Sequence, residues 1–261
     1  MKLPVHIYHS DIANQNTEVE KQVEKIIDNL GETNIINVSK QIFFREDDDV
    51  LAGIEPHKNS KLQKSNRYFA DPTRWIREKV SAAHWLGLHL TKGKSILDLG
   101  TGAGWFIYVC KQLGHNCCGT DIVNRPEYEA GYRFLNVEII GELTYPMKKM
   151  NINRTFDYIT TMRSFLGQRP AAWSKEEWKF FLADMRLHLN DNGHLFLACN
   201  KGSKLDSRYR HLPDNEKSFW GHKELQEWFA PYVIPAEKQY RGMRPSTLYI
   251  HKKNIQKLLD S

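Results

Sequence analysis

From residue 95 onward, the chain alternates short apolar runs with segments whose apolar residues recur at helical spacing. Strands alternating with helices predict a mostly parallel sheet with helices on both faces. The predicted helices are residues 104–113, 126–135, 175–189 and 223–229. The predicted strands are residues 95–99, 116–122, 137–140, 158–162 and 194–198, followed by an antiparallel couple of residues 238–242 and 247–252.

The first third of the chain is less regular. Residues 18–30 have an amphipathic pattern, so we expect a helix that begins with Thr17 as N-cap and ends at Gly31. Residues 53–66 are polar and typical of a loop, and a further helix is predicted from Pro72 to about residue 91. We therefore divide the chain into a partly helical N-terminal appendage or cap, residues 1–66, and a main domain, residues 67–261.

Charge is unevenly distributed along the 261 residues. Residues 1–60 carry 6 basic and 11 acidic side chains, whereas residues 61–95 carry 8 basic and 2 acidic ones. The net charge of +6 is compatible with anionic partners, but it is equally typical of an ordinary mixed surface. No run approaches the roughly 18 apolar residues of a membrane span, and no secretory signal follows Met1. We expect a cytoplasmic protein that does not enter a membrane.

The cysteines suggest neither a disulfide framework nor a metal site. Cys110, Cys117, Cys118 and Cys199 lie in apolar surroundings and lack the paired spacing of zinc ligands. Buried free cysteines usually behave as small apolar side chains, so we expect reduced thiols and no bound metal.

A glycine-rich segment, residues 98–104, lies between a predicted strand and a predicted helix and reads D-x-G-x-G-x-G. Glycines at such a turn allow a sharp bend and let a ligand approach the backbone. A dinucleotide fingerprint would have glycine where Trp105 stands, and a P-loop would need Gly-Lys-Ser/Thr. The spacing therefore favours a different nucleotide-like cofactor, although a nicotinamide-binding unit with a degraded third glycine stays open as an alternative.

Residues 96–106 closely resemble the first motif of class I S-adenosylmethionine-dependent methyltransferases. The resemblance implies S-adenosylmethionine as cofactor, with Asp98 organising its methionine end. It also implies that Asp121, which ends the second predicted strand, holds the ribose hydroxyls, because a carboxylate can accept from two adjacent hydroxyls. Further cofactor contacts implied by these two motifs are Gly100, Thr101, Gly102, Gly104, Trp105 and Ile122.

Downstream and upstream of these motifs the resemblance is looser. It implies a doubly wound, seven-stranded sheet with an antiparallel last strand, covered by helices on both faces. Glu142 is the match for an acid near the adenine amine, and Met162 and Arg163 follow the fourth strand where the methyl is transferred. Tyr68 and Arg74 precede the glycine segment and are expected to close over the cofactor, with Arg67 or Arg74 pairing with the methionine carboxylate. Asp157 is expected to be structural.

The leading hypothesis is methyl transfer to an oxygen or nitrogen atom of a small-molecule acceptor, either a metabolite or a sugar-like compound. His211 and His222 are candidates for the general base that a hydroxyl acceptor requires, and Arg163 is a third catalytic candidate. The alternatives are an RNA methyltransferase, suggested by the basic residues 61–95, and a non-catalytic S-adenosylmethionine-binding protein. The chain lacks Asn/Asp-Pro-Pro-Tyr/Phe and Pro-Cys after the fourth strand, which argues against adenine-N6 and pyrimidine-C5 methylation.

Overall fold

The computed structural model describes residues 12–31, 72–121, 126–142, 147–162, 164, 166, 173–199, 223–240, 243 and 247–261. The predicted loop of residues 53–66 lies outside the described residues, as does most of the proposed appendage.

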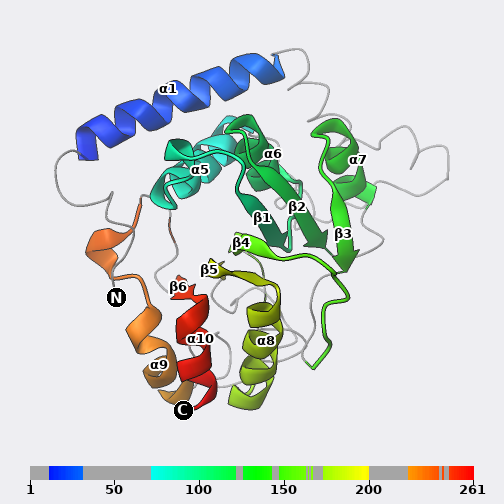
Figure 1. Ribbon diagram of the computed structural model, residues 1–261. Coiled ribbons are helices and arrows are strands. Elements are labelled where there is room, and N and C mark those ends of the chain that lie inside the picture. Colours follow the sequence, from blue (N-terminus) through cyan, green and yellow to red (C-terminus); the bar gives the residue numbers. More distant parts are fainter. Residues whose placement is uncertain are drawn as a thin grey trace, which may run out of the picture.

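The centre of the described fold is a twisted sheet of six strands (Figure 1). Its strands are β1 (Ser95–Leu99), β2 (Asn116–Asp121), β3 (Ile139–Glu142), β4 (Phe156–Met162), β5 (Leu189–Ala198) and β6 (Leu248–His251). The strand order is β3-β2-β1-β4-β5-β6, and neighbours run parallel except β5 and β6, which are antiparallel. The chain winds outward from β1 to β3 and then returns to β4 on the other side. This doubly wound order places a topological switch between β1 and β4, where such folds bind ligands.

Helices cover both faces of the sheet (Figure 1). One face carries α5 (Pro72–Trp85), α6 (Trp105–Gln112) and α7 (Pro126–Phe134), and the other carries α8 (Lys175–Leu187), α9 (Lys223–Phe229) and α10 (Lys252–Leu259). Three short 3-10 turns, η2 (Leu88–Leu90), η4 (Ala230–Tyr232) and η5 (Ala236–Lys238), complete the described elements. Each face has its own apolar core, because successive side chains of a strand point to opposite sides: Ile96 faces α5 and α6, and Leu97 faces α8.

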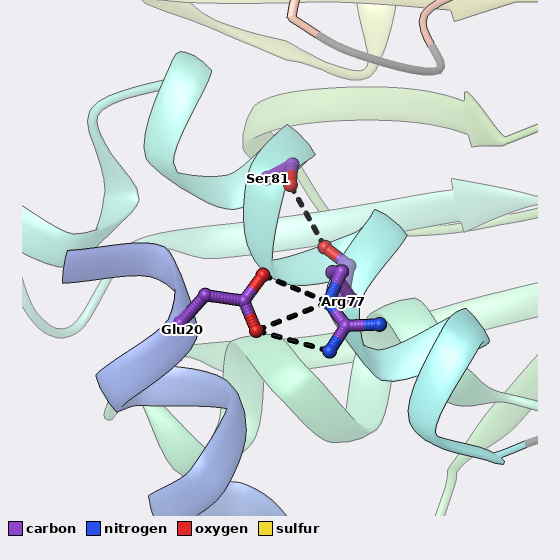
Figure 2. Close-up of polar contacts among 3 residues, drawn as sticks. All are labelled: Glu20, Arg77 and Ser81. Carbon is purple, nitrogen blue, oxygen red and sulfur yellow. Dashed lines mark hydrogen bonds and ion pairs between the residues drawn. The ribbon is translucent and has the colours of Figure 1, made fainter. Parts of the chain in front are cut away.

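Helix α1 (Ile12–Leu30) lies against α5 and outside it, so that α5 separates α1 from the sheet (Figure 1). Val23, Ile26 and Leu30 are buried in the same apolar cluster as the inner face of α5. Figure 2 shows the polar part of this contact, in which Glu20 receives hydrogen bonds from Nε and Nη2 of Arg77 at 2.8 to 3.1 Å.

Two details differ from the sequence-based expectations, and one agrees with them. Helix α1 begins at Ile12, so Thr17 lies inside it and is not its N-cap; the carbonyls of the preceding turn accept the N–H groups that Thr17 was expected to cap. The helix ends as predicted, at Gly31, whose φ of 77° lets its N–H reach the carbonyls of Ile27 and Asp28. Residues 252–259 form helix α10, although residue 252 was predicted as the end of a strand and no element was predicted for residues 253–259.

The described sheet has six strands, whereas seven were expected. The described part of the predicted strand 238–242 begins in η5 and contains no strand; residues 241 and 242 lie outside the described residues. Instead, Val233 forms an isolated antiparallel bridge with Leu248, and the N–H of Ile234 donates to the carbonyl of Thr247 at 2.9 Å. The outer edge of β6 is therefore paired by a single bridge where a full strand was expected.

Candidate active site

The glycine segment forms a tight loop between β1 and α6, as the sequence predicted. Gly100, Gly102 and Gly104 have φ angles of 71°, 59° and 89°, a region that side chains with a Cβ rarely adopt. The carbonyl of Thr120, at the end of β2, accepts hydrogen bonds from the N–H groups of Gly100 and Thr101 at 2.8 and 3.1 Å. A Cβ built on Gly102 would meet no atom within 4 Å, so the loop backbone is open at its middle residue.

Asp98 lies at the carboxyl end of β1 and is only 1% exposed. Its Oδ1 accepts a hydrogen bond of 2.8 Å from Thr160 Oγ1, on the neighbouring strand β4. Burial raises the pKa of the Asp98 carboxyl to about 7, although the hydrogen bond from Thr160 and the charge of Lys79 oppose this shift. A carboxyl group in this environment gains or loses its proton near neutral pH and favours a cationic partner.

Asp121 ends β2 on the other side of the loop and is buried. Its carboxylate accepts a hydrogen bond from the N–H of Gly102, which ties the loop to the strand. Tyr132, on α7, lies close enough for the charge of Asp121 to add to the effect of burial, and both raise the pKa of the Tyr132 phenol. Asp98 and Asp121 thus flank the glycine loop, one at the end of each strand.

Glu142 ends β3 and is the register partner of Asp121, so the two acids stand side by side at one edge of the sheet. Unlike Asp121, Glu142 is exposed, and its Oε2 lies 2.9 Å from Nζ of Lys148. The carboxyl ends of β1, β2 and β3 therefore carry one acid each.

The end of β4 is packed by neutral side chains in its described residues. Met162, the last residue of the strand, is buried on the α5 side of the sheet. The Ser164 hydroxyl bonds to the Thr161 hydroxyl and accepts the N–H of Leu166 at 3.2 Å. Burial raises the pKa of the nearby Cys199 thiol to about 12, so this thiol stays protonated at neutral pH. All four cysteines are free and buried, as expected.

Several predicted site residues lie outside the described residues: Tyr68, Ile122, Arg163, His211 and His222. Among the others, Trp105 is 3% exposed and packs in the apolar cluster between α6 and the sheet. Arg74 is exposed on α5. Thr101 is buried, and its hydroxyl donates to the Asp98 carbonyl at 2.9 Å, so its side chain fixes the loop.

Sequence reasoning did not single out Lys79 and Thr160, which both act on Asp98. Thr160 gave no local signal, because its contact with β1 depends on strand pairing. Lys79 did give one, since it falls on the apolar stripe of its helix, four residues after Trp75 and three after Ile76. A lysine at an apolar position of an amphipathic helix indicates a buried charge that needs a partner.

A family model described as a methyltransferase domain matches residues 68–232, more than half of the chain. The chain belongs to this methyltransferase family. It is a class I S-adenosylmethionine-dependent methyltransferase, and its cofactor is S-adenosylmethionine. The described residues fit this cofactor, because the loop is open at Gly102 and is flanked by two buried carboxyl groups, which can accept hydrogen bonds from an ammonium or from hydroxyls.

Solved structures with a similar arrangement include a putative class I S-adenosylmethionine-dependent methyltransferase from Listeria monocytogenes, at 11% identity and a TM-score of 0.42 over 90% of this chain and 88% of that one. A methyltransferase from Clostridium acetobutylicum is 19% identical, with a TM-score of 0.41, and the match covers 54% of this chain and 56% of that chain. An amino pentose methyltransferase from Micromonospora echinaspora is also 19% identical, with a TM-score of 0.38, and the match covers 48% of this chain and 51% of that chain. This chain thus spans about half the length of the latter two.

A search of curated proteins found no match. Within the described ranges, no helix is long and apolar enough to cross a membrane.

Proposed function

We propose that this methyltransferase transfers a methyl group to an oxygen or nitrogen atom of a small-molecule acceptor, a metabolite or a sugar-like compound. The observation that carries the methyl-transfer chemistry is the grouping of Asp98, the open glycine loop and Asp121 at the carboxyl end of the sheet, beside the end of β4. In this proposal Asp121 receives the ribose hydroxyls and Glu142 the adenine amine. The backbone of Gly100, Gly102 and Gly104 passes beneath the cofactor.

The choice of a small acceptor over RNA rests on how the basic residues of α5 are used. Arg77 pairs with Glu20 of α1, and Lys79 is buried beside Glu78. Two of the eight basic side chains of residues 61–95 thus form internal ion pairs, which reduces the charge available to phosphates. Residues 72–85 of this stretch form helix α5, whose inner face packs in the core of the domain.

When bound, S-adenosylmethionine supplies a methyl group that its sulfonium already activates. The chain's own task is to align the acceptor with that methyl, and such positioning contributes about 7–11 kcal/mol in favourable cases. We assign the alignment to the end of β4, at Met162, and to the next residue, Arg163. The glycine loop and Asp98 hold the other reactant, S-adenosylmethionine, in place.

An acceptor hydroxyl must lose a proton as it attacks, whereas an amine can attack in its neutral form and lose a proton afterwards. We propose His211 or His222 as the base for a hydroxyl acceptor. Replacing the true base with alanine should remove the acidic limb of the pH–rate profile for a hydroxyl acceptor and leave that for an amine acceptor unchanged.

The acceptor class is tested by incubating the protein with S-adenosylmethionine that carries a radiolabelled methyl, together with panels of small alcohols, amines and amino sugars or with bulk RNA. We expect label in one small-molecule class and none in RNA. Label confined to RNA would overturn the acceptor proposal. Cofactor binding without transfer to any acceptor in either panel would favour the non-catalytic alternative and overturn the proposal as a whole.

A further inference from the structure

Lys79 is a buried cation on the inner face of α5. Its side chain is only 7% exposed, although lysine is almost never this buried without a partner. It shares the stripe of α5 that packs on the sheet, and its helix neighbours on that stripe include Trp75, Ile76 and Val80. Placing an ammonium there costs free energy, so the position needs an explanation in terms of nearby charge.

Three groups near Lys79 offset part of the cost of burying its positive charge. Its Nζ lies 3.2 Å from Oε1 of Glu78, whose side chain is 12% exposed, and 5.2 Å from the ring centre of Trp75. It is also close enough to Asp98 for its charge to lower the pKa of that carboxyl. A buried cation, a carboxyl group and an aromatic face thus lie together on α5, and the charge of this cation acts on the carboxyl group at the end of β1.

The opposite side of α5 provides a contrast. Arg77 points away from the sheet toward Glu20 of α1, as Figure 2 shows, and Arg74 is three residues before it on the same side of the helix. Of the cations on α5, Lys79 is therefore the one on the face directed at Asp98. Arg74, which the sequence suggested for the methionine carboxylate, is exposed on the other face.

The methionine end of S-adenosylmethionine carries one positive and one negative group, the α-ammonium and the α-carboxylate. We propose that Lys79 is a cofactor-binding residue that receives the α-carboxylate, while Asp98 receives the α-ammonium. The buried lysine and the buried aspartate then form a matched pair for a zwitterion, and each is complementary to one of its charges. This inference concerns the cofactor alone and does not depend on which acceptor is methylated.

Groups on five of the described elements interact with Asp98. Lys79 faces it from α5 and Asp121 from β2, while Cys110 on α6 and Tyr132 on α7 interact with its charge; Thr160 on β4 donates a hydrogen bond. Lys79 is the cation among the groups that act on Asp98 in the described residues. Among these groups, Lys79 is therefore the one that can offset the negative charge of a ligand carboxylate bound beside Asp98.

The test compares two ligands by isothermal titration calorimetry. Decarboxylated S-adenosylmethionine keeps the sulfonium and the amine but lacks the α-carboxylate. In Lys79→Met, we expect the Kd for S-adenosylmethionine to rise about 10- to 100-fold, the range expected for loss of a charged hydrogen bond. The Kd for the decarboxylated ligand should stay within about twofold of the wild-type value, since it lacks the group that Lys79 binds.

Arg77→Met is the matched control, because it removes one positive charge from the outer face of the same helix. It should leave the affinity for both ligands unchanged. 5′-Methylthioadenosine, which lacks the whole amino acid end, reports whether the adenosine site stays intact, and Lys79→Met should bind it as the wild type does. Where Lys79→Met does not fold, Lys79→Gln carries the same test, since it removes the charge but keeps a hydrogen-bond donor for Glu78.

Two results would overturn the assignment. An equal loss of affinity for S-adenosylmethionine and the decarboxylated ligand would mean that Lys79 only supports Asp98 or the packing of α5. Unchanged affinity for both ligands in Lys79→Met would mean that another residue binds the carboxylate. Neither measurement uses an acceptor, so failure here is distinguishable from failure of the proposed small-molecule activity.

Discussion

The two ends of the sheet hold aspartates in opposite environments. Asp98, at the carboxyl end of β1, is buried, its carboxylate accepts a hydrogen bond from the Thr160 hydroxyl, and burial raises its pKa to about 7. Asp157, at the amino end of β4, accepts hydrogen bonds from the N–H and the hydroxyl of Ser95 and from the amide of Asn190. Burial opposes these bonds, but together they leave the pKa of Asp157 below its usual value.

In our proposal, this difference separates a structural end of the sheet from a functional one. The amino end satisfies its carboxylate with groups of the chain and so joins β1, β4 and β5. The carboxyl end has a buried, partly protonated carboxyl, a buried lysine and three glycines with positive φ. Such features cost stability and persist where a ligand uses them.

The largest effect is expected from Asp98→Asn. The folded-state pKa of about 7 exceeds the reference value of 3.8, so the folded wild type favours the protonated form and loses stability as pH rises between these values. Asparagine is neutral throughout, so the variant should be more stable than the wild type by about 2–4 kcal/mol at pH 8.

Urea unfolding at pH 8 and at pH 4 measures this effect. The gain should shrink strongly at pH 4, where the wild-type carboxyl is protonated in the folded state. A variant that is no more stable than the wild type at pH 8 would remove the contrast between the two aspartates.

At the amino end of the sheet, replacing the aspartate is expected to lower stability. Asp157→Ala leaves the N–H of Ser95 without its acceptor and should lower the free energy of unfolding by about 1–3 kcal/mol. It should not change the Kd for S-adenosylmethionine. Asp191→Ala is a suitable control, because the Asp191 side chain is fully exposed and its ion pair with Lys252 should contribute little. Loss of cofactor affinity in Asp157→Ala would contradict the structural role.

A smaller effect is expected in the pH dependence of cofactor affinity. The pKa of the Asp98 carboxyl is about 7, so this group is mostly protonated at pH 6. If the α-ammonium binds the ionised form, the carboxyl must release its proton when the cofactor binds at that pH. The Kd for S-adenosylmethionine should then rise about tenfold from pH 8 to pH 6, equivalent to about 1.4 kcal/mol. Calorimetry in buffers of different ionisation enthalpy should detect proton release at pH 6. Asp98→Asn should show no such release, whereas release of the same size in this variant would assign the proton to another group.

Local patterns predicted the parts of this molecule that depend on neighbouring residues. The glycine segment, Asp98 and Asp121 were recognisable because they occupy fixed positions at the ends of successive strands. The structural role of Asp157 is confirmed by its bonds to Ser95 and Asn190, and it followed from its place at the start of a strand.

Other features depend on contacts between distant parts of the chain, and the sequence did not predict them. Thr160 reaches Asp98 only because β4 pairs with β1, 62 residues away in sequence. Lys79 and helix α10 are different, because they were not predicted although the sequence carries a local signal for each. Lys79 falls on the apolar stripe of α5, and Ile255, Leu258 and Leu259 recur at helical spacing in α10.

The central claim is that the carboxyl end of β1 and β2, and not another part of the fold, binds S-adenosylmethionine. Calorimetric titration of the wild type, Asp121→Asn and Asp157→Asn with S-adenosylmethionine tests it most directly. We expect Asp121→Asn to lose about 1–3 kcal/mol of binding free energy, because the ribose hydroxyls lose a charged acceptor, while Asp157→Asn binds as the wild type does. Unchanged affinity in Asp121→Asn would contradict the placement of the cofactor site.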